Sequence, residues 1–428
     1  MIKRISFAIA LLGTTELAGA AMANPIKTVF VIAMENENFI QPANQFTASN
    51  EQIFGNPNAP FINALIGGTA TNVLVGGTPT NISAQTALAG NYHNVLANAA
   101  GTNHIHPSEP SYLWSEGGTN YGVLNDNQPF GAGGTEQNTA NHLTGQMQAQ
   151  GVTWKSYQEG IDLANNGSNQ KTNTVLPQSQ WTVPLTNFSG TSPAYTNPYN
   201  GSHQFDYAAK HDPQIFFTDT SGGNDATTAN PQASHYAPIE QLQSDLNNNT
   251  VAQYNWITPD QFNDMHTALS GTFQGLTNAN DKRIKQGDNF LAQIVPIIMA
   301  SDAYKNDGAI VLWWDETEPD GAAGDNPDDL THFLTEIVIS PDVKPNVNGL
   351  PYESQVFMTH SSDLRTMQEI FGVGALGSNI WFGDAANAND LSDLFLADAI
   401  PELPEPSAAP FLLLGLTALG FASRRRKS

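Results

Sequence analysis

The chain has 428 residues, no cysteine and a formal net charge of −24 at pH 7. Without cysteine, neither a disulfide framework nor a thiolate metal site is possible. The strongly acidic balance disfavours nucleic acid and anionic membrane as partners, because like charges repel.

The first predicted element is an export leader at residues 1–23. Lys3 and Arg4 precede the apolar run 5–12, which is too short to span a bilayer comfortably as a retained helix. The small residues of Ala21-Met22-Ala23 are typical of a signal-peptidase site. We therefore expect a removable signal peptide, cleaved after Ala23 by signal peptidase.

The first half of the body, from residue 24 onward, alternates between strand and helix patterns. Lys27–Met34 (KTVFVIAM) is a β-branched apolar run and predicts a buried parallel strand. Residues 165–202 are rich in Asn, Thr, Ser, Pro and Gly and predict a long insertion. The other expected elements are a helix start at Pro60–Leu65, a strand at Thr69–Val75, a helix at Thr135–Gln150, a strand at Val152–Tyr157, a strand at Ile215–Thr218, a helix at Ile239–Leu246 and a strand at Tyr254–Thr258.

The second half continues the alternation up to residue 400. Asn289–Ser301 has helical apolar spacing, with Asp288 expected as its N-cap. Ala309–Trp314 (AIVLWW) predicts another buried strand, followed by a strand at Glu336–Ser340 and an amphipathic helix at Leu364–Phe371. Strands that alternate with helices predict an α/β fold: one domain with a doubly wound, mostly parallel central sheet flanked by helices, and with loop insertions.

Residues 401–428 carry a second targeting signal. Pro404-Glu405-Pro406 precedes the apolar stretch 408–422 and a terminal basic cluster at 424–427. An apolar helix before basic residues is typical of a stop-transfer anchor. The three features in this order also resemble the PEP-CTERM sorting signal of Gram-negative bacteria, which an exosortase-type enzyme removes. We expect transient membrane anchoring by this helix and export to the periplasm, outer surface or extracellular matrix.

Four polar clusters follow predicted strands or adjoin a tight loop: Glu35-Asn36, His106-Pro107-Ser108-Glu109-Pro110, Asn263-Asp264-Met265-His266 and Asp315-Glu316. Ligand groups gather at the carboxyl ends of strands in open α/β sheets. Oxygen ligands suit a divalent cation, which would activate a serine hydroxyl beside it. Asp315-Glu316 favours a cation, because adjacent buried acids repel each other. Taken alone, Glu35-Asn36 could instead cap a helix, and Ser108 could be a turn residue.

Together the motifs resemble the phosphoesterase family that contains bacterial acid phosphatases and phospholipases C, within the alkaline phosphatase-like superfamily. Val29–Phe39 is similar to the opening motif of that family, and His106–Trp114 is similar to its nucleophile segment His-Pro-Ser-x-Pro-Asn-Tyr. The later motifs follow in the same order: Trp256–Pro259, Asn263–His266, Gly287–Leu291, Trp314–Glu316 and His360–Gly372. The resemblance covers residues 26–374.

The resemblance implies a role for each matching position. Ser108 would be the nucleophile, forming a phosphoserine and touching the metal. Asp264 would orient His266 or a ligand. The metal ligands would be Glu35, Asn36, Ser108, Asp315 and Glu316. The groups that contact the phosphoryl group, one of them as general acid, would be His106, His235 and His266. The cation stays open among calcium, magnesium, manganese and zinc.

Two departures from the family pattern shape the functional hypotheses. Ser111 stands where the family has Asn, which weakens the expected support of the nucleophile loop. The extra C-terminal domains of many phospholipases C have no counterpart, which favours soluble phosphate esters over phospholipids. The sequence therefore predicts an exported, metal-dependent, acid phosphatase-like phosphoesterase. The alternatives are a phospholipase C-type phosphodiesterase and a non-catalytic surface or matrix protein that retains the fold.

Overall fold

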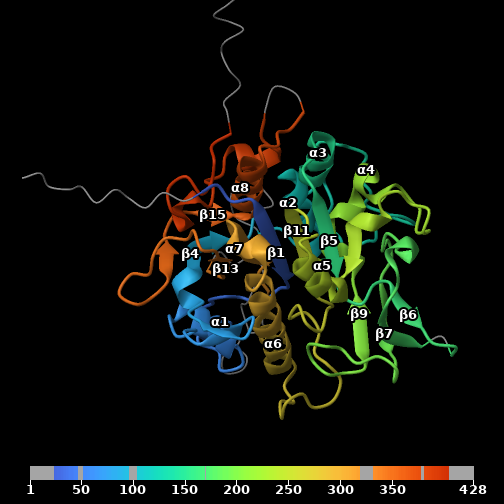
Figure 1. Cartoon of the computed structure of the whole chain (residues 1–428), viewed down its shortest axis with the longest axis horizontal. Helices are drawn as coiled ribbons and strands as arrows, with labels where there is room; N and C mark the ends of the chain where they lie inside the picture. Colours follow the sequence, from blue (N-terminus) through green and yellow to red (C-terminus); the bar gives the residue numbers. More distant parts are fainter. Residues whose placement is uncertain are drawn as a thin grey trace, which may run out of the picture.

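A nine-stranded mixed sheet organises the chain (Figure 1). The structure is a computed structural model that describes residues 24–46, 52–95, 104–168, 170–318, 331–376 and 380–403. The expected signal peptide and the sorting signal from residue 404 onward lie outside the described residues. Among the helices that are described, none combines the length and the apolar character needed to cross a bilayer.

The sheet is parallel apart from one strand. Its order is β10-β5-β11-β1-β12-β13-β4-β14, and β15 also pairs with β4. Only β13 is antiparallel to its neighbours, β12 and β4. The strands are β1 Thr28–Met34, β4 Thr86–His93, β5 Trp154–Gln158, β10 Tyr236–Pro238, β11 Tyr254–Thr258, β12 Gly308–Trp314, β13 Leu334–Ile339, β14 Tyr352–Ser354 and β15 Met358–Thr359. The prediction of a mostly parallel sheet is confirmed.

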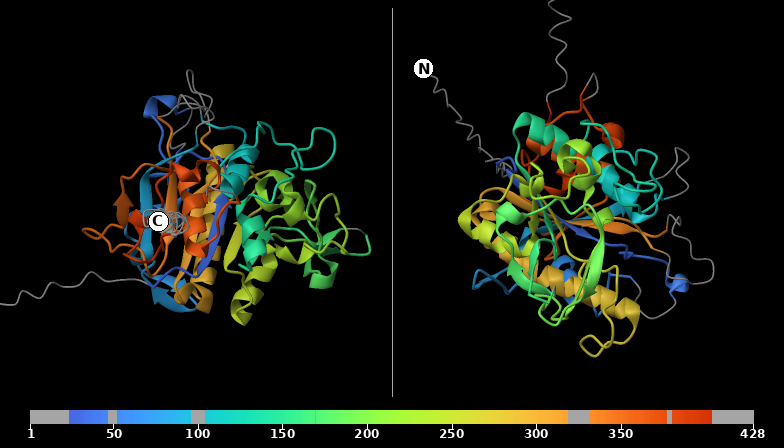
Figure 2. Two further views of the ribbon diagram at one scale, coloured as in Figure 1. Left: turned by 90° about the horizontal axis from the view of Figure 1, so that it is seen from above. Right: turned by 90° about the vertical axis from the view of Figure 1, so that its right-hand side faces the viewer.

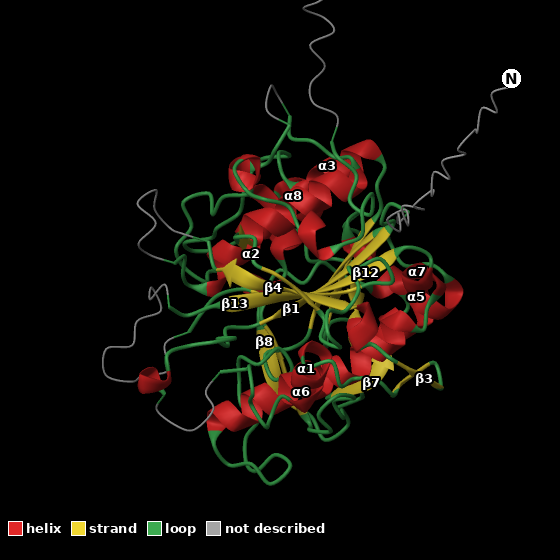
Figure 3. Ribbon diagram, turned by 90° about the vertical axis from the view of Figure 1, so that its left-hand side faces the viewer, coloured by secondary structure: helices red, strands yellow, loops and turns green. Residues whose placement is uncertain are grey.

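Helices cover both faces of this sheet (Figures 2 and 3). One face carries α2 Ser108–Gly117, α3 Leu143–Gln150 and α8 His360–Phe371, with α4 Thr218–Ser221 beside α3. The other face carries α1 Pro60–Ile66, α5 Leu242–Asn248, α6 Ala279–Met299 and α7 Asp302–Lys305. Because both faces are covered, every residue of β12 is buried, and this is why such strands are continuous apolar runs in the sequence.

The insertion expected at residues 165–202 lies beyond β5, outside the main sheet (Figure 1). It is not devoid of secondary structure, because it contributes to two small antiparallel sheets. These are formed by β6 Leu163–Asn165 with β7 Lys171–Val175, and by β8 Phe188–Thr191 with β9 Gln204–Tyr207. Elsewhere, the strand expected at Thr69–Val75 shortens to β2 Val73–Val75, which pairs with β3 Thr78–Thr80.

Three expectations about local structure are wrong. Residues 135–142 are polar and Asn- and Thr-rich, so they offer no apolar face, and the helix begins only at Leu143. The strand expected at Ile215–Thr218 is instead a 3-10 turn, Pro213–Phe216, followed by α4. Asp288 is not an N-cap of α6, which begins ten residues earlier with Asn278 accepting from Asp281 N.

Asp288 caps a different helix from the one expected. Its carboxylate accepts hydrogen bonds from Phe61 N at 3.2 Å and from Ile62 N at 2.9 Å, in the first turn of α1. A negative charge at that position satisfies backbone donors that the helix leaves unpaired. Asp288 therefore ties the middle of α6 to the start of α1.

Two acidic side chains are buried between the sheet and α8. Glu336 on β13 is fully buried, and within the described part of the chain neither of its carboxylate oxygens has a hydrogen-bond partner. Asp363, in the first turn of α8, accepts a hydrogen bond from the Tyr92 hydroxyl. Burial raises the pKa of both carboxyls well above the ordinary range, and the charge of Asp363 raises the pKa of Glu336 further.

The raised pKa values of Glu336 and Asp363 predict that the free energy of unfolding falls as the pH rises. A carboxyl whose pKa is higher in the folded state than in the unfolded state stabilises the fold fully at pH values below its unfolded-state pKa of about 4. This stabilisation is lost as the pH rises towards the folded-state pKa. In Glu336→Gln, the decline of Tm between about pH 5 and pH 8 should therefore be smaller than in the wild type. Glu353→Gln, at an exposed position on β14, is the matched control. Parallel Tm curves for the wild type and Glu336→Gln would contradict the expectation.

Candidate functional site

Polar side chains converge where β1 and β12 end. The two strands pair in parallel up to their last residues, with Met34 opposite Trp314. Glu35-Asn36 and Asp315-Glu316 therefore emerge together at the carboxyl edge of the sheet, as the sequence predicted. All four are buried: Glu35 and Asp315 are 0% exposed, Glu316 is 2% and Asn36 is 8%.

Ser108 meets these carboxylates from the first turn of α2. Its hydroxyl lies 3.2 Å from Glu35 Oε2 and 3.0 Å from Glu316 Oε1, and it is 1% exposed. The hydroxyl has a single hydrogen, so it can donate to only one of the two carboxylates at a time. A third contact is the ammonium group of Lys210, which donates to Ser108 Oγ at 3.2 Å.

The donor set fits a divalent cation. Among the described residues, neither carboxylate oxygen of Asp315 has a hydrogen-bond partner, and Asn36 Oδ1 has none either. Burial and the nearby carboxylates of Glu35 and Glu316 raise the pKa of Asp315 well above its ordinary range. Oxygens that are buried, mutually repelling and unpartnered are stabilised when they coordinate a cation. The structure brings the side chains that the sequence predicted as ligands, Glu35, Asn36, Ser108, Asp315 and Glu316, to this one edge of the sheet.

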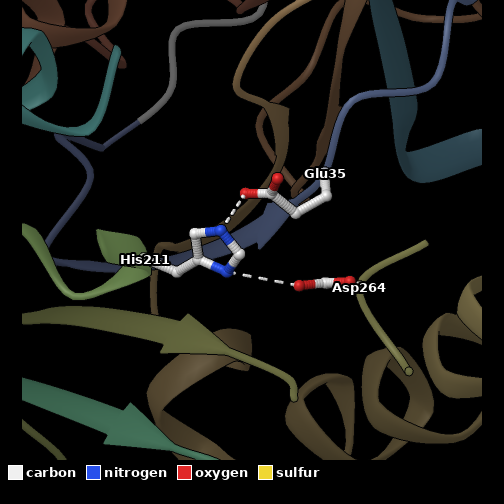
Figure 4. A group of neighbouring side chains, drawn as sticks. All are labelled: Glu35, His211 and Asp264. Carbon is white, nitrogen blue, oxygen red and sulfur yellow. Dashed lines mark ion pairs between the residues drawn. The ribbon is translucent and has the colours of Figure 1, made fainter. Parts of the chain in front are cut away.

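His211, which our sequence analysis overlooked, lies between two carboxylates of the site (Figure 4). Its Nε2 is 3.0 Å from Glu35 Oε1, and its Nδ1 is 3.4 Å from Asp264 Oδ2. The ligand atoms of these three residues lie within 4.8 Å of one another, so a metal ion could also bridge them. However, each ring nitrogen lies within ion-pair distance of a different carboxylate, an arrangement that suits an imidazolium paired with both.

The charges around His211 agree with that geometry. Burial would lower the pKa of His211, but the charge of Glu35 and hydrogen bonds to Asp264 and Glu35 raise it. Burial alone would raise the pKa of Glu35, yet the charge and hydrogen bond of His211, with the charge of Lys210, lower it below its usual range. Glu35 is therefore an ionised carboxylate whose two oxygens face opposite partners, His211 on one side and Ser108 on the other.

Lys210 stays charged although it is mostly buried. Its side chain is 12% exposed. Burial would lower its pKa, but the carboxylates of Glu35, Asp126 and Asp315 raise it. Lys210 and His211 are adjacent in a chain that has only 16 Lys and Arg residues against 40 Asp and Glu. That pairing of two basic residues was the available sequence signal.

Two of the three predicted histidines lie at the site. His106 Nδ1 is 2.7 Å from Glu316 Oε2, and the side chain is 21% exposed. The His266 ring lies 6.0 Å from the His211 ring, and its backbone N–H donates to Asp264 Oδ1 at 2.7 Å. Burial, with the charges of Lys210 and His211, lowers the pKa of His266 to about 4, so its ring is neutral. Asp264 thus orients both His211 and the backbone of His266.

The structure does not bring His235 to this group. His235 precedes β10, its Nδ1 pairs with Trp154 O at 2.9 Å, and its ring stacks on the Trp154 ring at 4.2 Å. Trp154 is the first residue of β5, which runs parallel to β1, so both side chains lie at the amino edge of the sheet. The site is at the carboxyl edge, and His235 is therefore excluded from it.

Comparison with known proteins places most of the chain in one family. The Phosphoesterase family matches residues 19–374, and the PEP-CTERM protein-sorting motif matches residues 402–427. A "Probable acid phosphatase" of Kluyveromyces lactis is 25% identical over 71% of this chain and 62% of its own. An "Acid phosphatase" of Aspergillus fumigatus is 22% identical over 64% of this chain and 47% of its own. The chain thus spans less than two thirds of either relative.

Two solved structures align with most of the chain. A protein in the alkaline phosphatase superfamily from Vibrio parahaemolyticus aligns with a TM-score of 0.40 and 11% identity, over 89% of this chain and 75% of its own. A phosphonate monoester hydrolase from Silicibacter pomeroyi aligns with a TM-score of 0.39 and 11% identity, over 86% of this chain and 76% of its own.

Proposed function

We propose that this chain, which belongs to the Phosphoesterase family, is a metal-dependent phosphoesterase that hydrolyses phosphate esters through Ser108. The observation that carries the proposal is the position of the Ser108 hydroxyl between Glu35, Glu316 and Lys210. A buried hydroxyl that faces two carboxylates and an ammonium group is suited to lose its proton and attack phosphorus. The acid phosphatase names of the fungal relatives support the same reaction class.

Glu35, Asn36, Ser108, Asp315 and Glu316 would hold the divalent cation. Bound there, a divalent cation would lower the pKa of the serine hydroxyl and offset the negative charge of the phosphoryl oxygens. The unpartnered oxygens of Asp315 and Asn36 support this assignment. The choice among calcium, magnesium, manganese and zinc stays open, because oxygen ligands suit each of them.

The remaining side chains supply proton transfer and charge. The Ser108 proton passes to the Glu316 carboxylate at 3.0 Å while Ser108 Oγ bonds to phosphorus. The bond to the leaving alcohol breaks, and that oxygen takes a proton from the partly exposed His106, which Glu316 orients at 2.7 Å. Water then attacks the phosphoserine and gives a proton to His106, which restores the acid. The bond between Ser108 Oγ and phosphorus breaks, Glu316 returns its proton to Ser108 Oγ, and inorganic phosphate leaves. His211 holds Glu35 in place, and neutral His266 lies beside it.

Hydrolysis of p-nitrophenyl phosphate by the purified protein tests the proposal. The assay is run with and without added divalent metals, with bis-p-nitrophenyl phosphate and phosphatidylcholine beside the monoester, and with Ser108→Ala as the background. Release of p-nitrophenol above that background is expected. If none of the three substrates is hydrolysed with any of the metals, the enzyme proposal is overturned. The alternative of a non-catalytic surface or matrix protein would then be favoured. Preference for a diester would favour the phospholipase C-type alternative.

Lys210 is expected to favour monoesters over diesters. One of its N–H groups faces Ser108 Oγ and a second faces Asp126 Oδ2 at 3.1 Å, which leaves the third for a phosphoryl oxygen. A monoester dianion carries one more charge than a diester, so it gains more from this cation. Lys210→Gln should therefore lower kcat/KM for p-nitrophenyl phosphate by about 100-fold, and less for the bis ester.

A matched lysine provides the control for that measurement. Lys155 is 15% exposed and pairs with Asp245 at 2.9 Å, in a similarly buried ion pair that has no place in the site. Lys155→Gln should leave the ratio of monoester to diester hydrolysis unchanged. An unaltered ratio in Lys210→Gln would contradict the role assigned to Lys210.

The sorting motif at residues 402–427 indicates export in a Gram-negative bacterium. We place the mature protein in the periplasm, on the outer surface or in the extracellular matrix, after processing by signal peptidase and an exosortase-type enzyme. The substrate and the cation would then come from outside the cytoplasm. Fractionation of cells with antibody against the folded domain tests this location, and recovery in the cytoplasm alone would contradict it.

A further inference from the structure

The carboxylate of Asp126 connects the helix turn that carries Ser108 with the ammonium group of Lys210. Asp126 lies in the loop between α2 and α3, and its side chain is 35% exposed. Its Oδ1 accepts a hydrogen bond from Glu109 N at 3.1 Å, in the turn that carries Ser108. Its Oδ2 accepts from Lys210 Nζ at 3.1 Å. Asp126 therefore joins the first turn of α2 to the ammonium group that faces Ser108.

Lys210 depends on such an anchor for its position. A lysine ammonium group is a compact charge on a flexible four-carbon stem, so its place is set by what it pairs with. Lys210 Nζ has two acceptors within the described residues, Ser108 Oγ and Asp126 Oδ2. Of these two, Ser108 moves into a bond with phosphorus during the reaction. Asp126 is then the acceptor that keeps the ammonium group beside the reacting oxygen.

We propose that Asp126 is a positioning residue that holds Lys210 against Ser108 during phosphoryl transfer, an inference that rests on the proposed function. The hydrogen bonds of Asp126 run to Glu109 N and Lys210 Nζ, so it acts on Ser108 through Lys210. Because the same carboxylate also holds the N–H of Glu109, the ammonium group and the nucleophile turn are fixed relative to one another. Small misplacements of a charged group at a reacting centre are costly in rate.

A double-mutant cycle on Asp126 and Lys210 tests the inference with p-nitrophenyl phosphate. Asp126→Asn keeps an oxygen that can accept from Glu109 N but turns an amide towards the ammonium group. We expect kcat/KM to fall about tenfold in Asp126→Asn, and to fall little further when Asp126→Asn is added to Lys210→Gln. A merely structural role would cost the same factor in both backgrounds, so equal factors would overturn the inference.

Controls separate this result from misfolding and from failure of the proposed function. Asp307→Asn breaks a remote surface pair with Lys27 at 2.5 Å and should leave the kinetics unchanged. Asp126→Ala removes both contacts and, if its Tm matches the wild type, should lose at least as much activity as Asp126→Asn. Full activity in both Asp126 variants would overturn the inference while the proposed function stands. An inactive wild type would instead contradict the proposed function.

Discussion

Replacement of Ser108 by alanine is expected to lower kcat for p-nitrophenyl phosphate by at least about 1,000-fold. The hydroxyl contacts Glu35, Glu316 and Lys210 at once, so its removal leaves these three charges without the group between them. The fold should survive, because alanine is a better helix former than serine and the lost contacts are not part of the core. Steady-state kinetics, with Tm as the check on folding, measure the effect.

A second serine on the same helix is the matched control. Ser115 is also buried, and its hydroxyl donates to Tyr112 O at 2.7 Å rather than into the site. Ser115→Ala should keep nearly full activity. A wild-type protein quenched in acid during turnover should carry phosphate on Ser108, found by peptide mass analysis. Activity in Ser108→Ala close to that of Ser115→Ala would contradict the nucleophile assignment.

The second large effect is expected for Asp315→Asn, which should separate activity from stability. A change in the groups that merely orient a metal ligand commonly costs about 10–100-fold in affinity or activity. Loss of a ligand carboxylate should therefore cost more than about 100-fold in activity and reduce the metal content. In metal-free protein the same change should raise Tm, because it removes a buried carboxylate that has no hydrogen-bond partner among the described residues.

Glu336→Gln is the control that separates the loss of a metal ligand from the removal of a buried carboxylate. Glu336 is likewise fully buried and without a hydrogen-bond partner among the described residues, but it belongs to β13 and not to the site. Its replacement should raise Tm near neutral pH and leave metal content and activity unchanged. Metal content is measured by elemental analysis after dialysis. Full metal occupancy in Asp315→Asn would contradict the ligand assignment.

The strands at the centre of the sheet could be predicted because both of their faces are buried. β1 and β12 begin within one residue of the expected position, and β11 spans the predicted range. β4 was not predicted, since its sequence TALAGNYH has few residues of high strand propensity. A Cβ at Gly90 would lie 2.2 Å from Glu353 Oε1, so a larger residue there would displace that exposed side chain, a tertiary contact that no local pattern records.

Strand patterns predicted the site only where its residues follow strands, and the family motif was needed for His106 and Ser108. Glu35 and Asp315 come directly after apolar runs, and parallel neighbours end at the same edge. Lys210 and His211 lie in a 3-10 turn within a long irregular region, so only the folded chain brings them beside Glu35. His235 was assigned to the site from the family resemblance, but it precedes β10 and lies at the amino edge of the sheet, away from the site.

The register of β1 and β12 has a further consequence for ion selectivity. The two strands are paired along all seven residues of each, and the proposed ligands Glu35 and Asp315 are the next residues of the same backbones. The distance between those backbones is fixed by the hydrogen-bond ladder and cannot widen to suit a larger ion without breaking it. Magnesium needs oxygens at about 2.0–2.1 Å and calcium at about 2.3–2.6 Å, a difference that side-chain rotation alone must supply. In the proposed site, a larger ion would therefore be accommodated by the side chains of Glu35 and Asp315, and by Ser108 on α2, rather than by a shift of the paired strands.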